Sequence, residues 1–217
     1  MKIRNLLLAA VAVSAIAGTA SAAVSVNVTS YFDPDLLPTG QVLLADFNDP
    51  GNPEAVLLAG YTLQLNGATV GVGEGDAGYS GTLPNNSTNY LTVPGAATAT
   101  FTSASGFKAF SLYMGSPDTY NSIRFIGDGF DETVSGANLF GGDSSQDWNW
   151  GARVNFSFGG AVVKQVILSS GANSFEVDNA AVAAVPEPAT WAMMIMGFGA
   201  AGAVLRQRRR MVGATFA

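Results

Sequence analysis

The 217-residue chain contains no cysteine and no histidine, and only 12% of its residues are charged. Without cysteine there is neither a disulfide nor a thiol nucleophile, and without both residues the preferred ligands of zinc and copper are missing. A hydrolytic triad usually takes its base from histidine, so this chemistry is also excluded. We predict a protein that is not an enzyme. A pair of carboxylates, as in a small glycan hydrolase, is the less favoured alternative.

Positive charge is scarce outside the two ends of the chain. Residues 23–184 contain four basic residues against 15 acidic ones, which gives a net charge of −11. Such a surface repels nucleic acid and anionic lipid, and it has no basic patch that could neutralise phosphates. We therefore expect no nucleic-acid partner.

The chain begins with the three-part pattern of a secretory signal. Two of the first four residues are cations, an apolar run covers residues 6–18, and the small residues Ala20 and Ala22 follow. This pattern predicts a signal peptide over residues 1–22 that is cleaved after Ala22. An N-terminal membrane anchor is the weaker alternative, because the apolar run falls short of the roughly 20 residues that a span needs. We expect export.

No stretch between residues 24 and 184 keeps an apolar period of 3.6 residues over the length of a helix. Several runs instead alternate apolar and polar residues with the period of two that is typical of half-buried strands. The clearest are AVSVNVTSY (23–31), YTLQLNG (61–67), FKAFSLYMG (107–115) and WNWGARVNFSFGG (148–160). Breakers rich in Gly, Pro and Asn separate these runs. We predict one β-domain over residues 23–184, an all-β antiparallel two-sheet sandwich of the jelly-roll kind, with a partly open barrel as the alternative.

A two-residue turn ends the last of these runs. Gly159 and Gly160 stand between it and the apolar run AVVKQVILS (161–169). Glycine accepts the positive φ angles of two-residue hairpin turns. We predict a β-hairpin at this point.

Two tryptophans are the candidate sugar-binding residues of the domain. Trp148 and Trp150 lie on one face of their run and could form a platform for sugar rings. The same face continues with Val154 and Phe156, so burial in the core is the favoured interpretation. Trp148 follows a polar loop and is the better candidate for an exposed rim.

Calcium is the most plausible ligand, because it takes carboxylate and carbonyl oxygens from loops. Acidic residues lie in the loops at 46–49, 128–132 and 143–147, but none has the spacing of an EF-hand. Asp178 could approach Asp46 if the first and last strands pair. We favour the interpretation that these acids are solvated and keep the protein soluble, with no cofactor. The alternative hypothesis is one structural Ca²⁺ site near Asp46 and Asp178.

The segment VPEPATWAMMIMGFGAAGAVLRQRRR (185–210) differs from the rest of the chain. Residues 189–205 are apolar or small except for one threonine, and as a helix they would reach about 26 Å, slightly less than the roughly 30 Å hydrocarbon core. Trp191 suits one membrane interface, and Pro186 and Pro188 predict an extended approach. A cationic cluster that suits the cytoplasmic side follows: Arg206, Arg208, Arg209 and Arg210.

The order of these parts resembles the PEP-CTERM sorting signal, in the variant with Trp and Ala after the second proline (PEPATWA). The resemblance implies that Pro186, Glu187 and Pro188 form the recognition element, that residues 191–205 are a transmembrane helix, and that residues 206–210 are the stop cluster. It also implies recognition by an exosortase, a membrane-embedded cysteine transpeptidase-like enzyme, with cleavage near the triplet. In that family the exported proteins come from Gram-negative bacteria, are held transiently at the inner membrane, and are linked to exopolysaccharide and biofilm. The seven residues 211–217 depart from the pattern, in which the chain usually ends sooner.

These observations predict a non-enzymatic exported protein of the cell surface, outer envelope or extracellular matrix. The first alternative is a carbohydrate-binding module for exopolysaccharide, which an exposed aromatic platform near Trp148 would favour. The second is the small glycan hydrolase, which needs two acids in one cleft. The third is a permanently anchored membrane protein, if the tail is never cut.

Overall fold

The computed structural model describes residues 23–71, 83, 86–115, 117–139, 151–184 and 188–213. Its strands are β1 (Ser25–Tyr31), β2 (Val42–Ala45), β3 (Tyr61–Asn66), β4 (Thr69–Gly71), β5 (Tyr90–Val93), β6 (Thr98–Met114), β7 (Asn121–Gly127), β8 (Phe130–Ser135), β9 (Ala152–Ser157), β10 (Val163–Ser170) and β11 (Phe175–Ala184). The helices in the described part are α1 (Gly136–Leu139) and α2 (Pro188–Gly213).

Every strand pair in the described part is antiparallel, which confirms the all-β prediction. Hydrogen bonds join the eleven strands into one sheet with the main order β4-β5-β11-β6-β10-β7-β8, and β1, β2, β3 and β9 attach to this path. The two-sheet sandwich is therefore not confirmed. The predicted strands at 23–31 and 61–67 correspond to β1 and β3, whereas the run at 107–115 is only the second half of the longer β6.

The long strand β6 connects the two parts of the sheet, because its neighbours change near Gly106. Its first half pairs with β3 and β10, and its second half pairs with β9 and β11. Gly106 has a φ of 76°, which favours glycine. A Cβ atom at this position would lie 2.5 Å from both Val162 Cγ1 and the Val163 carbonyl oxygen. Only glycine fits this crossing without displacing the neighbouring chain.

The predicted hairpin at Gly159 and Gly160 is wrong, although a turn does form there. Both glycines have positive φ angles, of 58° and 94°, but β9 and β10 do not pair with each other. Both strands pair with β6 instead, with Ser157 opposite Ala109 and Val163 opposite Phe107. The turn carries the chain past the point where β6 changes neighbours. Turn residues specify where the chain bends, whereas β6 supplies the partner of each flanking strand.

Phenylalanine rings fill the core on the inner face of the sheet. Phe125 of β7 lies 5.1 Å from Phe156 of β9 and 5.0 Å from Phe158, measured between ring centroids. Strands β7 and β9 are not neighbours in the sheet, so the sheet curves until its inner face packs against itself. Phe110 of β6 completes the contact, with its ring 6.5 Å from that of Phe125. Each fully buried side chain of this kind contributes roughly 1.5–3 kcal/mol.

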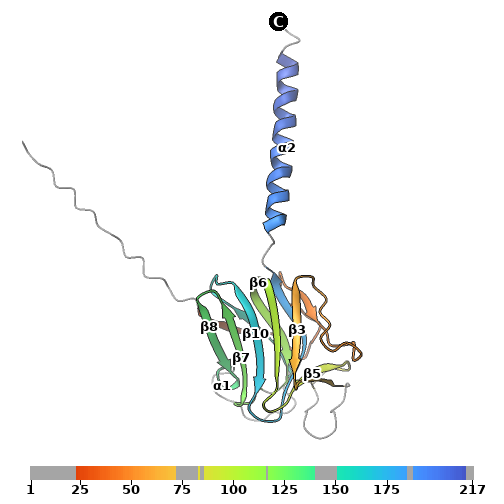
Figure 1. The fold of residues 1–217 in the computed structure, drawn as a ribbon, viewed down its shortest axis with the longest axis vertical. Coiled ribbons are helices and arrows are strands. Elements are labelled where there is room, and N and C mark those ends of the chain that lie inside the picture. The colour runs from red at the N-terminus through yellow and green to blue at the C-terminus, as the bar shows by residue number, and fades with distance from the viewer. Residues whose placement is uncertain are drawn as a thin grey trace, which may run out of the picture.

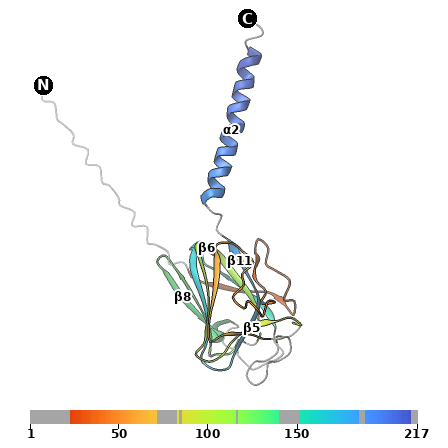
Figure 2. The ribbon, with the colours of Figure 1, turned by 45° about the vertical axis from the view of Figure 1, so that its right-hand side comes forward.

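The first and last strands of the domain begin and end at the same end of the molecule. Ser25 of β1 lies opposite Ser157, which lies opposite Ala109, which in turn lies opposite Ala183 of β11. These four residues form one row across four neighbouring strands. Helix α2 leaves this end and extends away from the strands (Figures 1 and 2).

Helix α2 is longer than the sequence predicted. We expected residues 191–205, but the helix begins at Pro188 and continues through the arginine cluster to Gly213. Proline is well tolerated in the first turn, and arginine is a good helix former, so neither residue type ends the helix where we placed its limits. Because the helix already begins at Pro188, the segment that we expected to be extended before it is reduced to residues 185–187, which lie outside the described residues. Within the described part of the chain, no helix combines the length and apolarity needed to cross a membrane. The transmembrane helix is therefore not shown.

Candidate functional site

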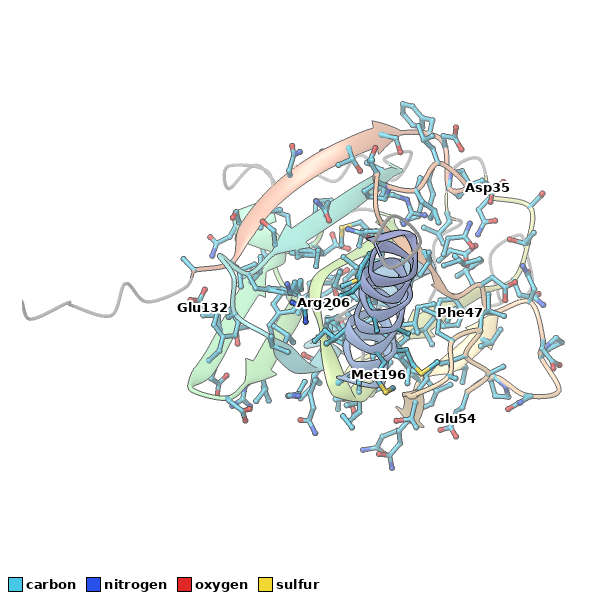
Figure 3. The ribbon with its side chains drawn as sticks, turned by 90° about the horizontal axis from the view of Figure 1, so that it is seen from above. Asp35, Phe47, Glu54, Glu132, Met196 and Arg206 are labelled. Carbon is cyan, nitrogen blue, oxygen red and sulfur yellow. The ribbon has the colours of Figure 1, made fainter. Side chains whose placement is uncertain are left out.

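The apolar side chains that the structure describes on helix α2 are all exposed. Among the side chains that the structure describes on this helix, Met193, Ile195 and Phe198 are 67%, 68% and 74% exposed. A Cβ atom added at Gly197, Gly199 or Gly202 would meet nothing within 4 Å. Figure 3 shows the helix from above, with Met196 and Arg206 on it. Exposed apolar surface of this extent marks a site of contact with a partner or a membrane.

The predicted sorting residues lie around and within this helix. Pro188 is the first residue of α2, and Arg206 is exposed. Trp191 and the remaining arginines also belong to the helix, but their side chains, like all of Pro186 and Glu187, lie outside the described residues. Strand β11 ends at Ala184, so in the sequence one residue, Val185, separates the sheet from the Pro-Glu-Pro triplet.

A second candidate is a row of three polar side chains across neighbouring strands at the opposite end of the sheet. Arg153 of β9 lies opposite Tyr113 of β6, and Tyr113 lies opposite Asp178 of β11. All three residues are fully buried. Strand alternation places their side chains on the face opposite the phenylalanine core.

Arg153 holds the loop that follows β1. Its guanidinium donates hydrogen bonds to the backbone carbonyl oxygens of Pro34 and Asn179, and to Ser111 Oγ at 3.2 Å. Burial lowers the pKa of Arg153 to about 10, and the carboxylates of Asp178, Asp33 and Asp35 oppose this shift. Its Nε has no hydrogen-bond partner among the described atoms. The arginine therefore stays charged at neutral pH and fixes the loop to β9.

Asp178 holds a different loop, the one that precedes β5. Its Oδ2 accepts hydrogen bonds from Asn86 Nδ2 at 2.6 Å and from Thr88 Oγ1 at 3.3 Å. Its Oδ1 accepts one from the backbone N–H of Asn179 at 2.7 Å. Burial raises the pKa of Asp178 to about 7, with a smaller contribution from the negative charge of Asp46, while these hydrogen bonds lower it. This carboxylate is costly to ionise unless a cation accompanies it.

The predicted approach of Asp46 to Asp178 occurs, but through a different strand. We expected the first and last strands to pair, whereas β1 pairs with β9 and it is β2 that pairs with β11, with Ala45 opposite Ala180. Asp46 then lies near enough to influence the pKa of Asp178. Among the described residues, no three acidic side chains come together in a way that could hold a metal ion. The structure therefore brings these two carboxylates within electrostatic range of each other and leaves the metal untested.

The other acidic candidates are dispersed. Asp49 accepts a hydrogen bond from the Gly51 N–H, Asp131 forms a salt bridge with Arg124, and Glu132 accepts a hydrogen bond from the Val24 N–H. Asp128 is exposed in the turn between β7 and β8. The remaining candidates, including the two tryptophans proposed for sugar binding, lie outside the described residues: Asp143, Asp147, Trp148 and Trp150.

Arg153 and Tyr113 are not among the site residues that the sequence pattern predicts. In their strands, Arg153 and Tyr113 alternate with apolar residues, so their side chains are predicted to point away from the core and to be exposed to solvent. They are buried because the loops that follow β1 and precede β5 cover that face. One available signal was that Arg153 is the only cation in its alternating run (148–160), in a domain with only four basic residues.

Comparison with known protein families matches residues 184–210 to the PEP-CTERM protein-sorting motif. The match begins at the last residue of β11 and ends within α2. It confirms the resemblance of this segment to the sorting signal and indicates a protein that is exported and sorted. Comparison with curated proteins gives no match.

Proposed function

We propose that this chain, which carries a PEP-CTERM protein-sorting motif, is a non-enzymatic protein that an exosortase sorts to the cell surface or the extracellular matrix. The exposed apolar surface of α2 supports this proposal best, because the described side chains of the helix do not pack against the core formed by the strands. A role in exopolysaccharide or biofilm is part of the same proposal.

The arrangement of the tail suits removal after delivery. In our proposal α2 contacts the inner membrane while the exosortase recognises Pro186, Glu187 and Pro188. Cleavage near this triplet leaves all of β11 in the domain, because the strand ends at Ala184. The released domain therefore keeps every hydrogen bond of the described sheet.

The test is mass spectrometry of the protein from its native host. The mature form is expected to end near Pro188, and the variant Glu187→Ala is expected to keep its full C-terminus and stay with the inner membrane. Glu54→Ala serves as the matched control, because it removes a carboxylate elsewhere and should leave processing unchanged. An intact C-terminus on the mature surface form refutes the proposal.

A second candidate function is binding of a neutral polysaccharide on the outer face of β3, β6, β10, β7 and β8. Three rows of residues cross these five strands, and every member is at least partly exposed. The rows are Thr62, Thr102, Gln165, Ile126 and Asp131; Gln64, Thr100, Ile167, Arg124 and Thr133; and Asn66, Thr98, Ser169, Ser122 and Ser135. Hydroxyl and amide groups predominate.

The charge of this face matches an uncharged partner. Arg124 and Asp131, the charged residues among the members of these three rows, form a salt bridge at 2.6 Å. The domain as a whole carries a net charge of −11. A hydroxyl-rich polymer could hydrogen-bond along the rows without electrostatic repulsion.

Thr→Val substitution tests this candidate because it removes a hydroxyl and keeps a β-branched side chain. Combined Thr100→Val and Thr102→Val should weaken retention of the protein on the host's purified exopolysaccharide several-fold. Thr29→Val, on the exposed face of β1, is the control. Equal retention of all three proteins eliminates this face as the binding site.

We also propose that the curved sheet is a sandwich whose two layers share β6. The contact between the rings of Phe125 and Phe156 supports it, since their strands are not neighbours in the sheet. In this arrangement Gly106 lies at the corner where β6 passes from one layer to the other, a common device in sheet packing.

Structural calcium near Asp46 and Asp178 remains a proposal. The fully buried Asp178 beside a second carboxylate supports it, because a divalent cation would offset the cost of ionising Asp178 next to Asp46. Added Ca²⁺ should raise the melting temperature of chelator-treated protein, and Asp46→Asn should abolish the increase. Asp49→Asn is the control. A melting temperature that calcium leaves unchanged contradicts the proposal.

A further inference from the structure

Glu132 occupies an inner position on the edge strand β8. Its neighbours at alternate positions, Phe130 and Val134, are both buried, whereas Asp131 and Thr133 are exposed. A carboxylate on the inner face of a sheet is costly without a partner. The salt bridge found among the described residues joins Arg124 to Asp131 and leaves Glu132 without a cation.

Glu132 contacts the start of the folded domain. Its Oε2 accepts a hydrogen bond from the backbone N–H of Val24 at 3.0 Å, in a partly buried position. The side chain of Val24 packs against the core immediately before β1. No backbone ladder joins β1 to β8 in the described part, because β1 pairs with β9 and β8 with β7. Figure 3 shows Glu132 beside the beginning of β1.

We propose that Glu132 binds the α-ammonium group that signal cleavage creates at Ala23. The inference uses cleavage after Ala22, as the sequence predicts, and is independent of the proposed sorting function. In that cleavage water adds across the Ala22–Ala23 amide, Ala22 takes the new carboxylate, and the Ala23 nitrogen becomes an amine that is protonated at neutral pH. The nitrogen of Ala23 is one residue from the Val24 N–H that already contacts Glu132.

The chemistry of the contact changes on processing. In the precursor the Ala23 nitrogen is a neutral amide, whereas the new ammonium is a cation with several donors. An opposite charge within about 4–6 Å favours the charged form of a group, and charge-assisted hydrogen bonds are stronger than neutral ones. Signal cleavage therefore strengthens the contact between the edge strand β8 and the start of the edge strand β1.

The experiment measures the pKa of the N-terminal amine in the exported full-length chain, purified in detergent, by NMR titration of the Ala23 resonance. We expect roughly 8.5–9 in the wild type and the ordinary value of roughly 7.7–8 in Glu132→Gln. Glutamine keeps an oxygen that can accept the Val24 hydrogen bond, so a purely structural role of Glu132 would leave the pKa unchanged. Asp128→Asn and Asp131→Asn control for the other nearby carboxylates.

A second comparison requires no substitution. Acetylation of the Ala23 amine removes its charge and should raise the unfolding equilibrium constant several-fold at pH 7. Because the contact raises the amine pKa in the folded state, this difference should disappear as the pH rises above about 9. Equal amine pKa values in the wild type and Glu132→Gln, no effect of acetylation, or a mature chain that does not begin at Ala23 would each overturn the proposal.

Discussion

At the scale of single residues, two buried ionisable side chains hold loops in place. Arg153 and Asp178 are fully buried, yet each one contacts a different loop across the same face of the sheet. Tyr113 lies between them, and burial together with the nearby Asp33 raises its pKa to about 12. A buried charge with partners is destabilising to break, because removal of one partner leaves the other unpaired. The row therefore specifies loop positions more than it increases stability.

The raised pKa of Asp178 predicts a pH dependence of stability. The folded-state value of about 7 lies above the ordinary value of 3.8, so the folded state binds the proton more tightly. The stabilisation from the neutral carboxyl group is complete below about pH 4 and is lost as the pH rises through 7. In the presence of chelator, Asp178→Asn should remove this slope, so its loss of stability relative to the wild type should be smaller at pH 8 than at pH 5.

Urea unfolding at pH 5 and pH 8 measures this effect. Asp46→Asn is the informative comparison, because it removes the smaller contribution to the pKa shift and keeps the titrating group. Its slope should be intermediate between those of the wild type and Asp178→Asn. Parallel pH profiles for the wild type and Asp178→Asn would show that Asp178 is ionised throughout this range.

At the scale of elements, β6 determines the arrangement of the strands. Six other strands depend on it, four directly (β3, β9, β10 and β11) and two through β11 (β2 and β5), and its change of neighbours at Gly106 decides which ones pair. The Gly159–Gly160 turn lies between β9, which pairs with the second half of β6, and β10, which pairs mainly with its first half. Alternation within each run predicts which face is buried, but it does not predict which strand lies alongside.

Gly106→Ala should destabilise the domain by roughly 2–4 kcal/mol, because the new Cβ would collide with Val162 Cγ1 and the Val163 carbonyl oxygen in addition to the cost of a positive φ. Gly129→Ala is the matched control. Gly129 has a similar φ of 69°, but its Cβ would meet nothing within 4 Å, so it should cost only about 1 kcal/mol. Urea midpoints of the two variants check this, and equal losses would show that the corner tolerates a side chain.

At the scale of the whole molecule, the strands and α2 are energetically separate. The described side chains of α2 are exposed, and the sheet ends before the helix begins. The start of β1 and the end of β11 lie at the same end, so a signal peptide and a sorting tail would leave the domain side by side. The buried row of Arg153, Tyr113 and Asp178 lies at the other end of the sheet.

A chain that stops at Ala184 should therefore fold as well as the full-length protein. Its urea midpoint should match that of the full chain in the same detergent, and it should remain soluble when the detergent is removed. A chain that stops at Ala180 is the control, because it loses the buried Val182 and the β11 pairs with Phe110 and Ala109. It should be unfolded or strongly destabilised. A large difference between full length and the Ala184 form would show that α2 stabilises the sheet.

The sequence by itself determined the features that are local. The sorting tail is recognised by the order of its triplet, apolar run and arginines, and the strands by alternation within a few residues. Both signals lie within short windows, so no distant contact is needed to detect them. The same holds for the breakers, including the turn at Gly159 and Gly160.

Only the tertiary structure decided which strands pair and which polar residues are buried. The failed hairpin and the unexpected burial of Arg153 have one physical cause: strand partners and loop covers come from residues that are far apart in sequence. Asp178 contacts Asn86, 92 residues earlier, and Glu132 contacts Val24, 108 residues earlier. Hydrogen bonds at such separations depend on the folded chain as a whole, so the periodicity of a short run cannot predict them.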